Sequence, residues 1–353
     1  MPADLSLDQV SLLLVWTAIA IYALAFMAYA WDLARRSAQS VAAKDAVSTV
    51  RERELVGAAV GGAFAPRDRQ VAASTGSASP RSQALFARIG TSLTWLAFLF
   101  HLGGDVTRGI AAGRVPWSNM YEFALTGTML IVAVFLGVLF RYDLRFLGAF
   151  ITGLIVLLLG GATLAFYVEI TPLADPLKSV WLVIHVFVAS LATAFFALAF
   201  GLSVLQLMQA RRERKMLAAA ALASTESSAA AVEASATVKA GPRYLRTLPS
   251  ADSLESLAYR FAIIGFIFWT FTLIAGAIWA NDAWGRYWGF DTKEVWTFVI
   301  WVLYAGYIHA RATRGWRGTR SAWLSIIGFS AVMFNFTIVN MFFKGLHVYS
   351  GLE

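Results

Sequence analysis

The 353-residue sequence contains no cysteine. This absence excludes a disulfide framework, zinc–thiolate sites and a catalytic thiol nucleophile. Any redox chemistry on the thiols of a substrate must therefore come from a partner. Charged residues are also scarce, at 14% of the chain, whereas 59% of the residues are hydrophobic and the mean hydropathy is +0.64. This balance is typical of an integral membrane protein.

Long apolar runs predict the architecture. A membrane-spanning helix needs roughly 20 mostly apolar residues. Eight stretches qualify: 11–30, 90–110, 121–140, 146–167, 184–208, 259–280, 294–311 and 321–343. We therefore expect an all-α polytopic membrane helical bundle with about eight transmembrane helices. The first run is predicted to be a helix and not a cleavable signal peptide, because its leading residues carry Asp4 and Asp8 but no basic residue.

The net charge of +8 indicates topology, and we expect no nucleic acid among the partners. When the eight stretches are threaded alternately, 23 of the 29 Lys and Arg residues fall on one side, in the connections 31–89, 141–145, 209–260 and 311–320. The positive-inside rule assigns that side to the cytoplasm. Both termini are then predicted to lie outside.

The predicted organisation follows from these spans. It comprises a first transmembrane helix (1–36), a cytoplasmic low-complexity loop (37–89), helices two to five with an outer segment at 111–123 (90–208), a basic and Ala/Ser-rich cytoplasmic loop (209–258), and three last helices with an outer aromatic segment and an outer histidine-bearing tail (259–353). Residues 37–85 are rich in Ser, Ala and Gly, and residues 216–242 are of low complexity. Neither segment can bury a core of its own, so we expect linkers or disorder there.

Residues 279–296, the aromatic segment, are the most informative stretch. Six aromatic residues fall within its eighteen positions: Trp279, Trp284, Tyr287, Trp288, Phe290 and Trp296. They are interleaved with five charged residues: Asp282, Arg286, Asp291, Lys293 and Glu294. Because the segment lies between two apolar runs, it must sit at a membrane surface. Such a mixture suits a large flat apolar ligand with ionic edges.

The chain has four histidines, and two of them fall on the predicted outer side with the aromatic segment. His185 opens the fifth span and His347 follows the eighth. Imidazole is a common axial ligand of haem iron, and two imidazoles make a six-coordinate low-spin site. Indoles can stack on the porphyrin, and four basic residues are candidates to pair with its propionates: Arg114, Lys178, Arg286 and Lys293. The alternative is that these histidines and tryptophans are interfacial anchors.

The other two histidines fall within predicted spans. His309 lies sixteen residues beyond Lys293, roughly 24 Å deeper in a helix, where an ionisable group is a functional-site hypothesis; it could instead extend to the inner headgroups beside Arg311. His101 lies mid-span and could simply be hydrogen-bonded within the bundle. In the outer segment 113–123, three polar residues could cap a helix or line the outer cavity: Asn119, Tyr121 and Glu122.

Two segments resemble a known family. Residues 284–296, Trp-Gly-Arg-Tyr-Trp-Gly-Phe-Asp-Thr-Lys-Glu-Val-Trp, resemble the tryptophan-rich WWD haem-handling signature of cytochrome c assembly proteins. Residues 113–122 resemble the Pro-x-x-Asn-x-Tyr-Glu element of the CcsA/ResC-type subunit of System II, labelled CcsB in some bacteria. The resemblance runs over about residues 90–350. Phe290 and Thr292 stand where the signature usually has Trp and Pro.

Three histidines match the family pattern in order and predicted side: His185 as the first outer, His309 as the transmembrane and His347 as the second outer histidine. The resemblance implies that haem b enters through a membrane site in which His309 is an axial ligand of the iron. It further implies that His185 and His347 then hold the iron as axial ligands on the outer side. The implied cofactor-binding residues around the haem are those of the aromatic segment: Trp279, Trp284, Arg286, Tyr287, Trp288, Phe290, Asp291 and Trp296.

The function implied by the resemblance is that of a haem-handling subunit of a holocytochrome c synthase. Such a subunit presents haem for thioether attachment to the CxxCH motif of apocytochrome c. The implied partners are a ResB-type membrane subunit and a thioredoxin-like thiol reductant. The implied location is the bacterial plasma membrane, with the active face outside. Three alternatives stay open: a haem exporter or carrier without ligation activity, a non-haem membrane transporter, and a respiratory b-type cytochrome.

Overall fold

The computed structural model describes residues 5–60, 85–225, 242–313 and 315–347, which form helices and no strand. The α-helices are α1 (Leu7–Val60), α3 (Leu85–Ala112), α4 (Met120–Leu139), α5 (Gly148–Ala165), α6 (Val180–Thr225), α8 (Ala251–Trp284), α9 (Thr292–Thr313), α10 (Thr319–Phe334) and α11 (Asn340–Phe342). The shorter elements are the 3₁₀ turns η1 (Arg145–Leu147), η2 (Asp175–Lys178) and η3 (Arg243–Thr247), and the π-helix η4 (Asn335–Val339).

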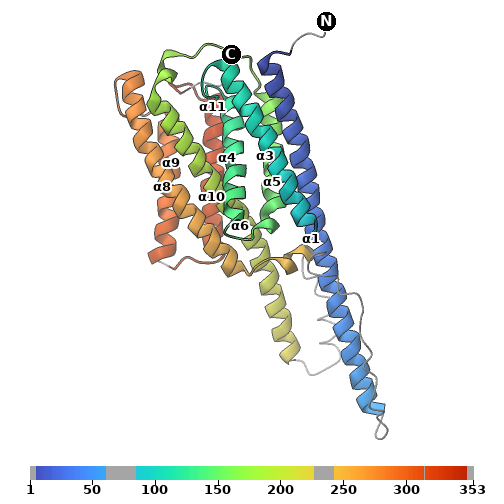
Figure 1. Ribbon diagram of the computed structural model, residues 1–353. Coiled ribbons are helices and arrows are strands. Elements are labelled where there is room, and N and C mark those ends of the chain that lie inside the picture. The colour runs from blue at the N-terminus through green and yellow to red at the C-terminus, as the bar shows by residue number, and fades with distance from the viewer. Residues whose placement is uncertain (1–4, 61–84, 226–241, 314, 348–353) are drawn as a thin grey trace.

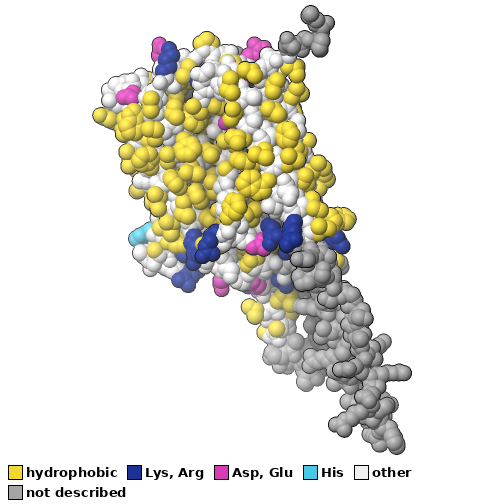
Figure 2. All heavy atoms as spheres, in the orientation of Figure 1, with side chains coloured by type: hydrophobic (Ala, Val, Ile, Leu, Met, Phe, Trp, Pro, Cys, Tyr) yellow, Lys and Arg dark blue, Asp and Glu magenta, His cyan; other side chains and the backbone are white. Residues whose placement is uncertain are grey.

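Seven of the described helical stretches are long and apolar enough to cross a membrane. Figure 2 shows hydrophobic side chains over the side of the bundle, whereas Lys and Arg gather near the end from which α1 and α6 extend. The expected all-α polytopic membrane bundle is therefore confirmed. The side of the membrane on which each terminus lies stays a prediction.

The seventh predicted span, 294–311, corresponds to α9, which has 22 residues but is not among the seven apolar stretches. Its polar and ionisable residues, among them His309 and Arg311, lower its hydropathy. Packing still fixes it in the bundle, because Ile300, Tyr304 and Tyr307 recur at helical spacing and are all buried. Tyr304 stacks on Phe196 of α6 with ring centroids 3.6 Å apart.

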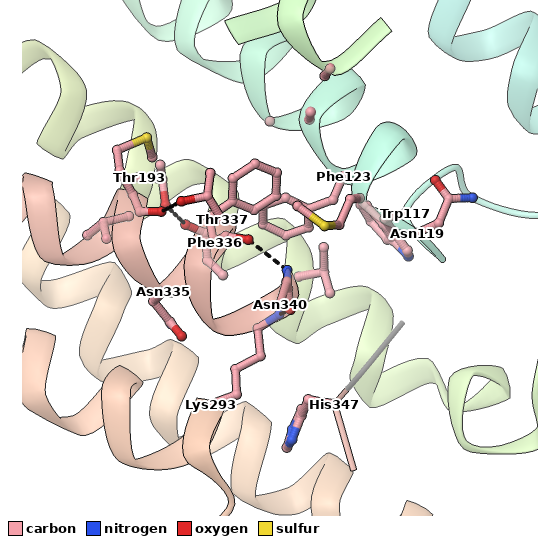
Figure 3. A pocket seen from close by; sticks show the side chains of 18 of the residues that line it. Trp117, Asn119, Phe123, Thr193, Lys293, Asn335, Phe336, Thr337, Asn340 and His347 are labelled. Atoms are coloured by element: carbon pink, nitrogen blue, oxygen red, sulfur yellow. Dashed lines mark hydrogen bonds between the residues drawn. The ribbon is translucent and has the colours of Figure 1, made fainter. Parts of the chain in front are cut away.

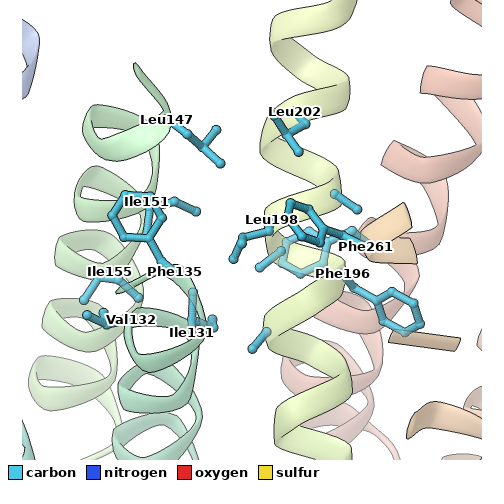
Figure 4. Close-up of a cluster of buried hydrophobic side chains, with 14 of the residues drawn as sticks. Ile131, Val132, Phe135, Leu147, Ile151, Ile155, Phe196, Leu198, Leu202 and Phe261 are labelled. Carbon is cyan, nitrogen blue, oxygen red and sulfur yellow. The ribbon is translucent and has the colours of Figure 1, made fainter. Parts of the chain in front are cut away.

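Helix α6 joins the two halves of the bundle. It packs against α4 on one side and against α8 and α10 on the other, while α1 packs against α3 and α5 (Figure 1). Large apolar side chains from α4, α5 and α6 form the core between the halves (Figure 4). Helix α6 therefore forms a wall shared by the two halves, α4–α5 and α8–α10.

Two helices are longer than the spans predicted for them. Helix α1 continues to Val60 and α6 to Thr225, and both extend beyond the other helices at one end of the bundle (Figure 1). Segments 37–60 and 209–225 are rich in Ala, Arg, Glu and Lys, which favour helix. The rest of the two predicted cytoplasmic loops, residues 61–84 and 226–241, lies outside the described residues.

At the opposite end, a buried ionic network ties four segments together. Arg108 of α3 is fully buried and bonds Asp8 at 2.6 Å, Glu122 at 3.1 Å and the carbonyl of Val168 at 2.8 Å. Glu122 also pairs with Arg114 at 2.6 Å. A buried cation with its hydrogen bonds satisfied fixes geometry. The network thus holds α1, α3, α4 and the connection between α5 and α6 in place at this end of the bundle.

Candidate functional site

His185 and His347 come together at this end of the bundle. His185 lies in the second turn of α6, and His347 follows α11 near the end of the chain. Trp279 of α8 contacts both imidazoles, with ring centroids 5.8 Å from His185 and 5.3 Å from His347. Trp284 lies 4.7 Å from the ring of His347. The structure thus brings His185, His347 and the aromatic segment together, as the sequence predicted.

Each imidazole is anchored through the same nitrogen. Nδ1 of His185 lies 2.9 Å from the carbonyl oxygen of Thr272, and Nδ1 of His347 lies 2.7 Å from Oδ2 of Asp291. A carbonyl and a carboxylate can only accept, so each Nδ1 carries the proton and donates. In a neutral ring the lone pair then belongs to Nε2. Among the described residues, Nε2 of neither histidine has a hydrogen-bond partner, so both present this atom as a potential ligand, oriented by the bond on the other side of the ring.

The neutral form of His347 is favoured by its surroundings. Burial lowers its pKa below the usual 6.5, and the nearby charge of Lys293 acts in the same direction. The hydrogen bond to Asp291 opposes this effect without overcoming it. His347 therefore keeps an available lone pair at neutral pH.

Two glycines create the space for these anchors. A Cβ on Gly276 would lie 2.7 Å from Cε1 of His185, so any larger residue would displace the ring. A Cβ on Gly345 would collide with the carboxylate of Asp291. The backbone N–H of Leu346 also donates to Asp291, at 3.0 Å. The tail that carries His347 is thus fastened to Asp291 at two points.

Local capping explains how the aromatic segment takes its shape. Helix α8 ends at Trp284, and Gly285 closes it in a left-handed conformation (φ 69°), which only glycine adopts readily. Helix α9 begins after Asp291, whose backbone N–H donates to Glu294 at 3.2 Å; Gly289 donates to the same carboxylate at 2.8 Å. This is a capping box, in which the third helical residue satisfies the backbone ahead of the helix. The loop that bears Asp291 is therefore fixed from both ends.

Two cavities flank the histidines. The larger has a volume of about 440 Å³ and lies between α4–α5 on one side and α8, α9 and α10–η4 on the other (Figure 3). The smaller, of about 90 Å³, lies under the aromatic segment. Six residues line both: His185, Thr272, Trp279, Lys293, Thr297 and His347. The larger volume is in the range of small-molecule and cofactor sites.

The wall of the larger cavity is mostly apolar. Small residues on α4, α5 and α6 create the hollow: Ala124, Gly127, Gly161, Ala162, Ala165 and Ala189. Several of the polar side chains lie on α9, η4 and α11, where Figure 3 shows Lys293 extended toward Asn340. The π-helical turn η4 precedes Asn340, whose side-chain amide donates to the carbonyl of Phe336 at 2.9 Å. Such turns occur frequently at functional sites.

The site residues fall in a region that matches a known family. Residues 117–347 match the family model described as Cytochrome C assembly protein. The chain belongs to the cytochrome c assembly protein family. The matched region contains His185, His347, the aromatic segment and every residue that lines the two cavities. This finding assigns the protein to cytochrome c biogenesis.

Curated relatives agree with this assignment. The chain is 35% identical over 250 residues to the cytochrome c biogenesis protein CcsA of Heterosigma akashiwo, covering 67% of this chain and 77% of the relative. It is 34% identical over 299 residues to CcsA of Synechococcus elongatus, covering 78% and 91%. The resemblance to the CcsA type is confirmed.

A solved structure shares the fold. It is described as Cytochrome c Heme Lyase CcmF and superposes with a TM-score of 0.56 at 14% sequence identity. The match covers 95% of this chain and 47% of that one. This cytochrome c assembly protein thus spans about half the length of CcmF. At this identity the likeness concerns the fold alone.

The other aromatic-segment residues occupy different positions around the site. Tyr287 and Trp288 line the smaller cavity; Tyr287 is 62% exposed and Trp288 38%. Phe290 is 80% exposed and has a positive φ of 59°, a strained conformation for an aromatic residue. Trp296 packs against Phe334 of α10 at 4.4 Å, and neither it nor Arg286 nor Phe290 lines either cavity. Haem contacts of all the residues of the aromatic segment stay predictions.

The remaining histidines lie apart from the pair. His309 is on the exposed face of α9 and lines neither cavity, so its role in haem entry stays a prediction. His101 is fully buried, with Nε2 3.0 Å from the carbonyl of Leu125 and Nδ1 3.4 Å from the hydroxyl of Tyr22. The reading of His101 as a histidine bonded within the bundle is confirmed.

The segment 113–123 combines both roles considered for it. Asn119 caps α4, since its side chain accepts the backbone N–H of Glu122 at 2.9 Å. Asn119 and its neighbour Trp117 also line the larger cavity. Sequence reasoning missed Arg108, whose signal was an arginine within an apolar run, and it missed Thr272, which acts through its backbone and leaves no signal.

Proposed function

We propose that this protein binds haem b between Nε2 of His185 and Nε2 of His347 and presents it to apocytochrome c for covalent attachment. One observation carries the proposal: two imidazoles from distant parts of the chain share a cavity, and each is anchored through Nδ1 with Nε2 left as a ligand atom. Two such ligands make a six-coordinate low-spin iron site.

The surroundings fit a porphyrin. The cavity wall is apolar over α4, α5 and α6, as a macrocycle requires, and Trp279 and Trp284 supply aromatic faces next to the imidazoles. A basic side chain, Lys293, supplies a complement to an acidic edge. Haem is the substrate here, and the chain positions it.

The attachment chemistry requires no residue of this chain as a catalyst. Each thiol of a CxxCH motif adds across one vinyl group, forming a C–S bond while its hydrogen goes to the other vinyl carbon. The His of that motif would replace one axial imidazole. Since this chain has no cysteine, both thiols come from apocytochrome c. The protein contributes orientation, which can account for much of the rate.

The wider setting follows from the same proposal. The distribution of basic residues favours an outer, extracytoplasmic site in a bacterial plasma membrane. The resemblance to System II proteins supports a ResB-type membrane subunit as partner in a holocytochrome c synthase. A thioredoxin-like reductant would keep the thiols of the substrate reduced. Haem would reach the outer site by way of His309.

Visible absorption spectra test the proposal. The detergent-purified chain, alone and with a ResB-type partner, is compared with the His185→Ala/His347→Ala double variant in the ferric and dithionite-reduced states. We expect a six-coordinate spectrum that the double variant loses or alters, together with loss of holocytochrome c formation. His101→Gln is the matched control, because its amide can keep the bond to Leu125.

Two outcomes count against the proposal. Well-folded protein with a featureless spectrum in both settings would favour a non-haem transporter. Haem bound through both histidines without holocytochrome c formation in the presence of its partner would favour a haem carrier.

A further inference from the structure

Four basic residues were candidates to meet an acidic edge of the ligand, and the structure separates them. Arg114 is engaged by the buried carboxylate of Glu122 at 2.6 Å. Lys178 pairs with Asp175 at 2.6 Å on the surface. Arg286 lines neither cavity. Lys293 differs from these three, because it lines both cavities together with the two outer histidines.

The ammonium group of Lys293 is incompletely satisfied. Its one side-chain hydrogen bond among the described residues goes to Oδ1 of Asn340, a neutral acceptor. Within that part of the chain no carboxylate lies in ion-pair range of Nζ. An ammonium has three N–H donors, so two remain for a ligand. A partly buried cation without a counter-ion is costly and therefore favours the binding of an anion.

The position of Lys293 strengthens this preference. It is the second residue of α9, at the positive end of the helix dipole, where a cation is unfavourable and an anion is favoured. Its neighbours on the same side of the cavity are polar: Thr297, Asn335 and Asn340. The opposite wall is apolar, so the cavity suits an amphiphile whose carboxylate points to α9.

We propose that Lys293 binds a propionate carboxylate of the haem that His185 and His347 hold. This inference rests on the proposed function and adds the ligand group recognised and the residue that recognises it. Asn340 would orient the ammonium group through its side-chain oxygen.

The contact has a consequence for the attachment reaction. Two axial ligands fix the iron but leave the macrocycle free to rotate about the axis that joins the two Nε2 atoms. A charged contact at the edge of the ring removes this freedom. Both vinyl groups must meet the two thiols of one CxxCH motif, and a rotated ring would misplace them. Lys293 therefore acts as a positioning residue as well as an affinity determinant.

The test compares ferric haem with its dimethyl ester, in which both propionates are neutral. The detergent-purified full chain, Lys293→Met, Lys293→Arg and the control Lys178→Met are titrated with each porphyrin and followed by visible absorption. We expect the native chain to prefer free haem by about 10-fold or more, as for a charge-assisted hydrogen bond. Lys293→Met should lose this preference and keep the six-coordinate spectrum. Lys293→Arg should keep most of it, and Lys178→Met all of it.

The outcomes separate this inference from the proposed function. A native chain that binds both porphyrins equally through His185 and His347, or a Lys293→Met variant with an unchanged preference, overturns the role of Lys293 alone. A native chain that binds neither porphyrin with a histidine-dependent spectrum overturns the haem site itself. The comparison of the two porphyrins on the native chain needs no variant, so a misfolded Lys293→Met protein would not remove the test.

Discussion

Replacing Asp291 with Asn would change the partner of His347 without changing its shape. The carboxylate accepts the Nδ1 proton of His347 at 2.7 Å and the backbone N–H of Leu346 at 3.0 Å. The Asn amide oxygen can accept one of these bonds, but it carries no charge. Because Asn is as good a helix N-cap as Asp, the start of α9 should be preserved. The variant therefore keeps the shape of the side chain but removes its charge and one of its two hydrogen bonds to the tail that carries His347.

The expected effect is on haem and not on the fold. Hydrogen-bond partners of metal-binding histidines typically contribute 10–100-fold to metal affinity. This factor corresponds to about 1.4–2.7 kcal/mol. We expect Asp291→Asn to weaken haem binding by a factor in this range. The reduction potential of the bound iron should rise, because a neutral partner makes the imidazole a weaker electron donor.

The assay is an absorption titration with ferric haem, followed by a redox titration of the complex, with thermal unfolding as a check on folding. Asp282→Asn serves as the control, since Asp282 bonds Ser179 at 2.9 Å and lines neither cavity. Unchanged affinity and potential in a folded Asp291→Asn protein would refute the view that Asp291 orients and polarises His347. A loss of affinity that Asp282→Asn reproduces would point to a general effect on the segment.

Three further predictions follow from the same geometry. Gly276→Ala should displace the ring of His185, reduce haem binding and lower the free energy of unfolding by about 1–3 kcal/mol, as measured by haem titration and thermal unfolding. Gly306→Ala, where a Cβ meets open space, should leave haem binding unchanged and be neutral or stabilising. Haem ligation should persist as the pH falls below 6.5 and be lost only as the pH passes through the lowered pKa of His347, which absorption spectra between pH 8 and 4 would follow. Arg108→Met should destabilise the fold by about 3 kcal/mol, because it removes one of the two ion-pair partners of the buried Glu122 and leaves the partly buried Asp8 without its arginine.

Each of these predictions has an outcome that contradicts it. Equal behaviour of the two glycine variants would mean that the close packing at His185 is unimportant. Loss of ligation with a midpoint at or above pH 6.5 would contradict a lowered pKa. If Arg108→Met unfolded at the same temperature as the native protein, the structural role of the network would be contradicted. The exposed pair of Arg145 with Asp143 offers a control, since its removal should change stability by less than about 1 kcal/mol.

The sequence was a good guide to the helices and to the pairing of the histidines. All eight apolar runs fell on helical stretches, and seven of these stretches are long and apolar enough to cross a membrane, because burial in lipid imposes length and composition directly. Alternation of the spans placed His185, His347 and the aromatic segment at one end of the bundle. Helix α9 is less apolar than these seven stretches. The buried side chains of Tyr304 and Tyr307 pack it against the rest of the bundle.

The anchors of the two imidazoles were beyond the reach of the sequence. One is a backbone carbonyl, at Thr272, and such a group is present at every residue. The other joins Asp291 to His347 across 56 positions of chain, and it depends on how the tail after α11 folds back. The charged residue Asp291 could be singled out from its motif, but its partner could not.

The sequence by itself determined that the chain is a helical membrane protein with two histidines and an aromatic segment at one end, since hydropathy and chain alternation act locally along the chain. The tertiary structure decided which of four basic residues stays unpaired beside them. Arg114 and Lys178 meet carboxylates, Arg286 lies outside the cavities, and Lys293 faces both histidine-lined cavities. Which charge meets its counter-ion depends on distances between helices, and only packing sets those distances.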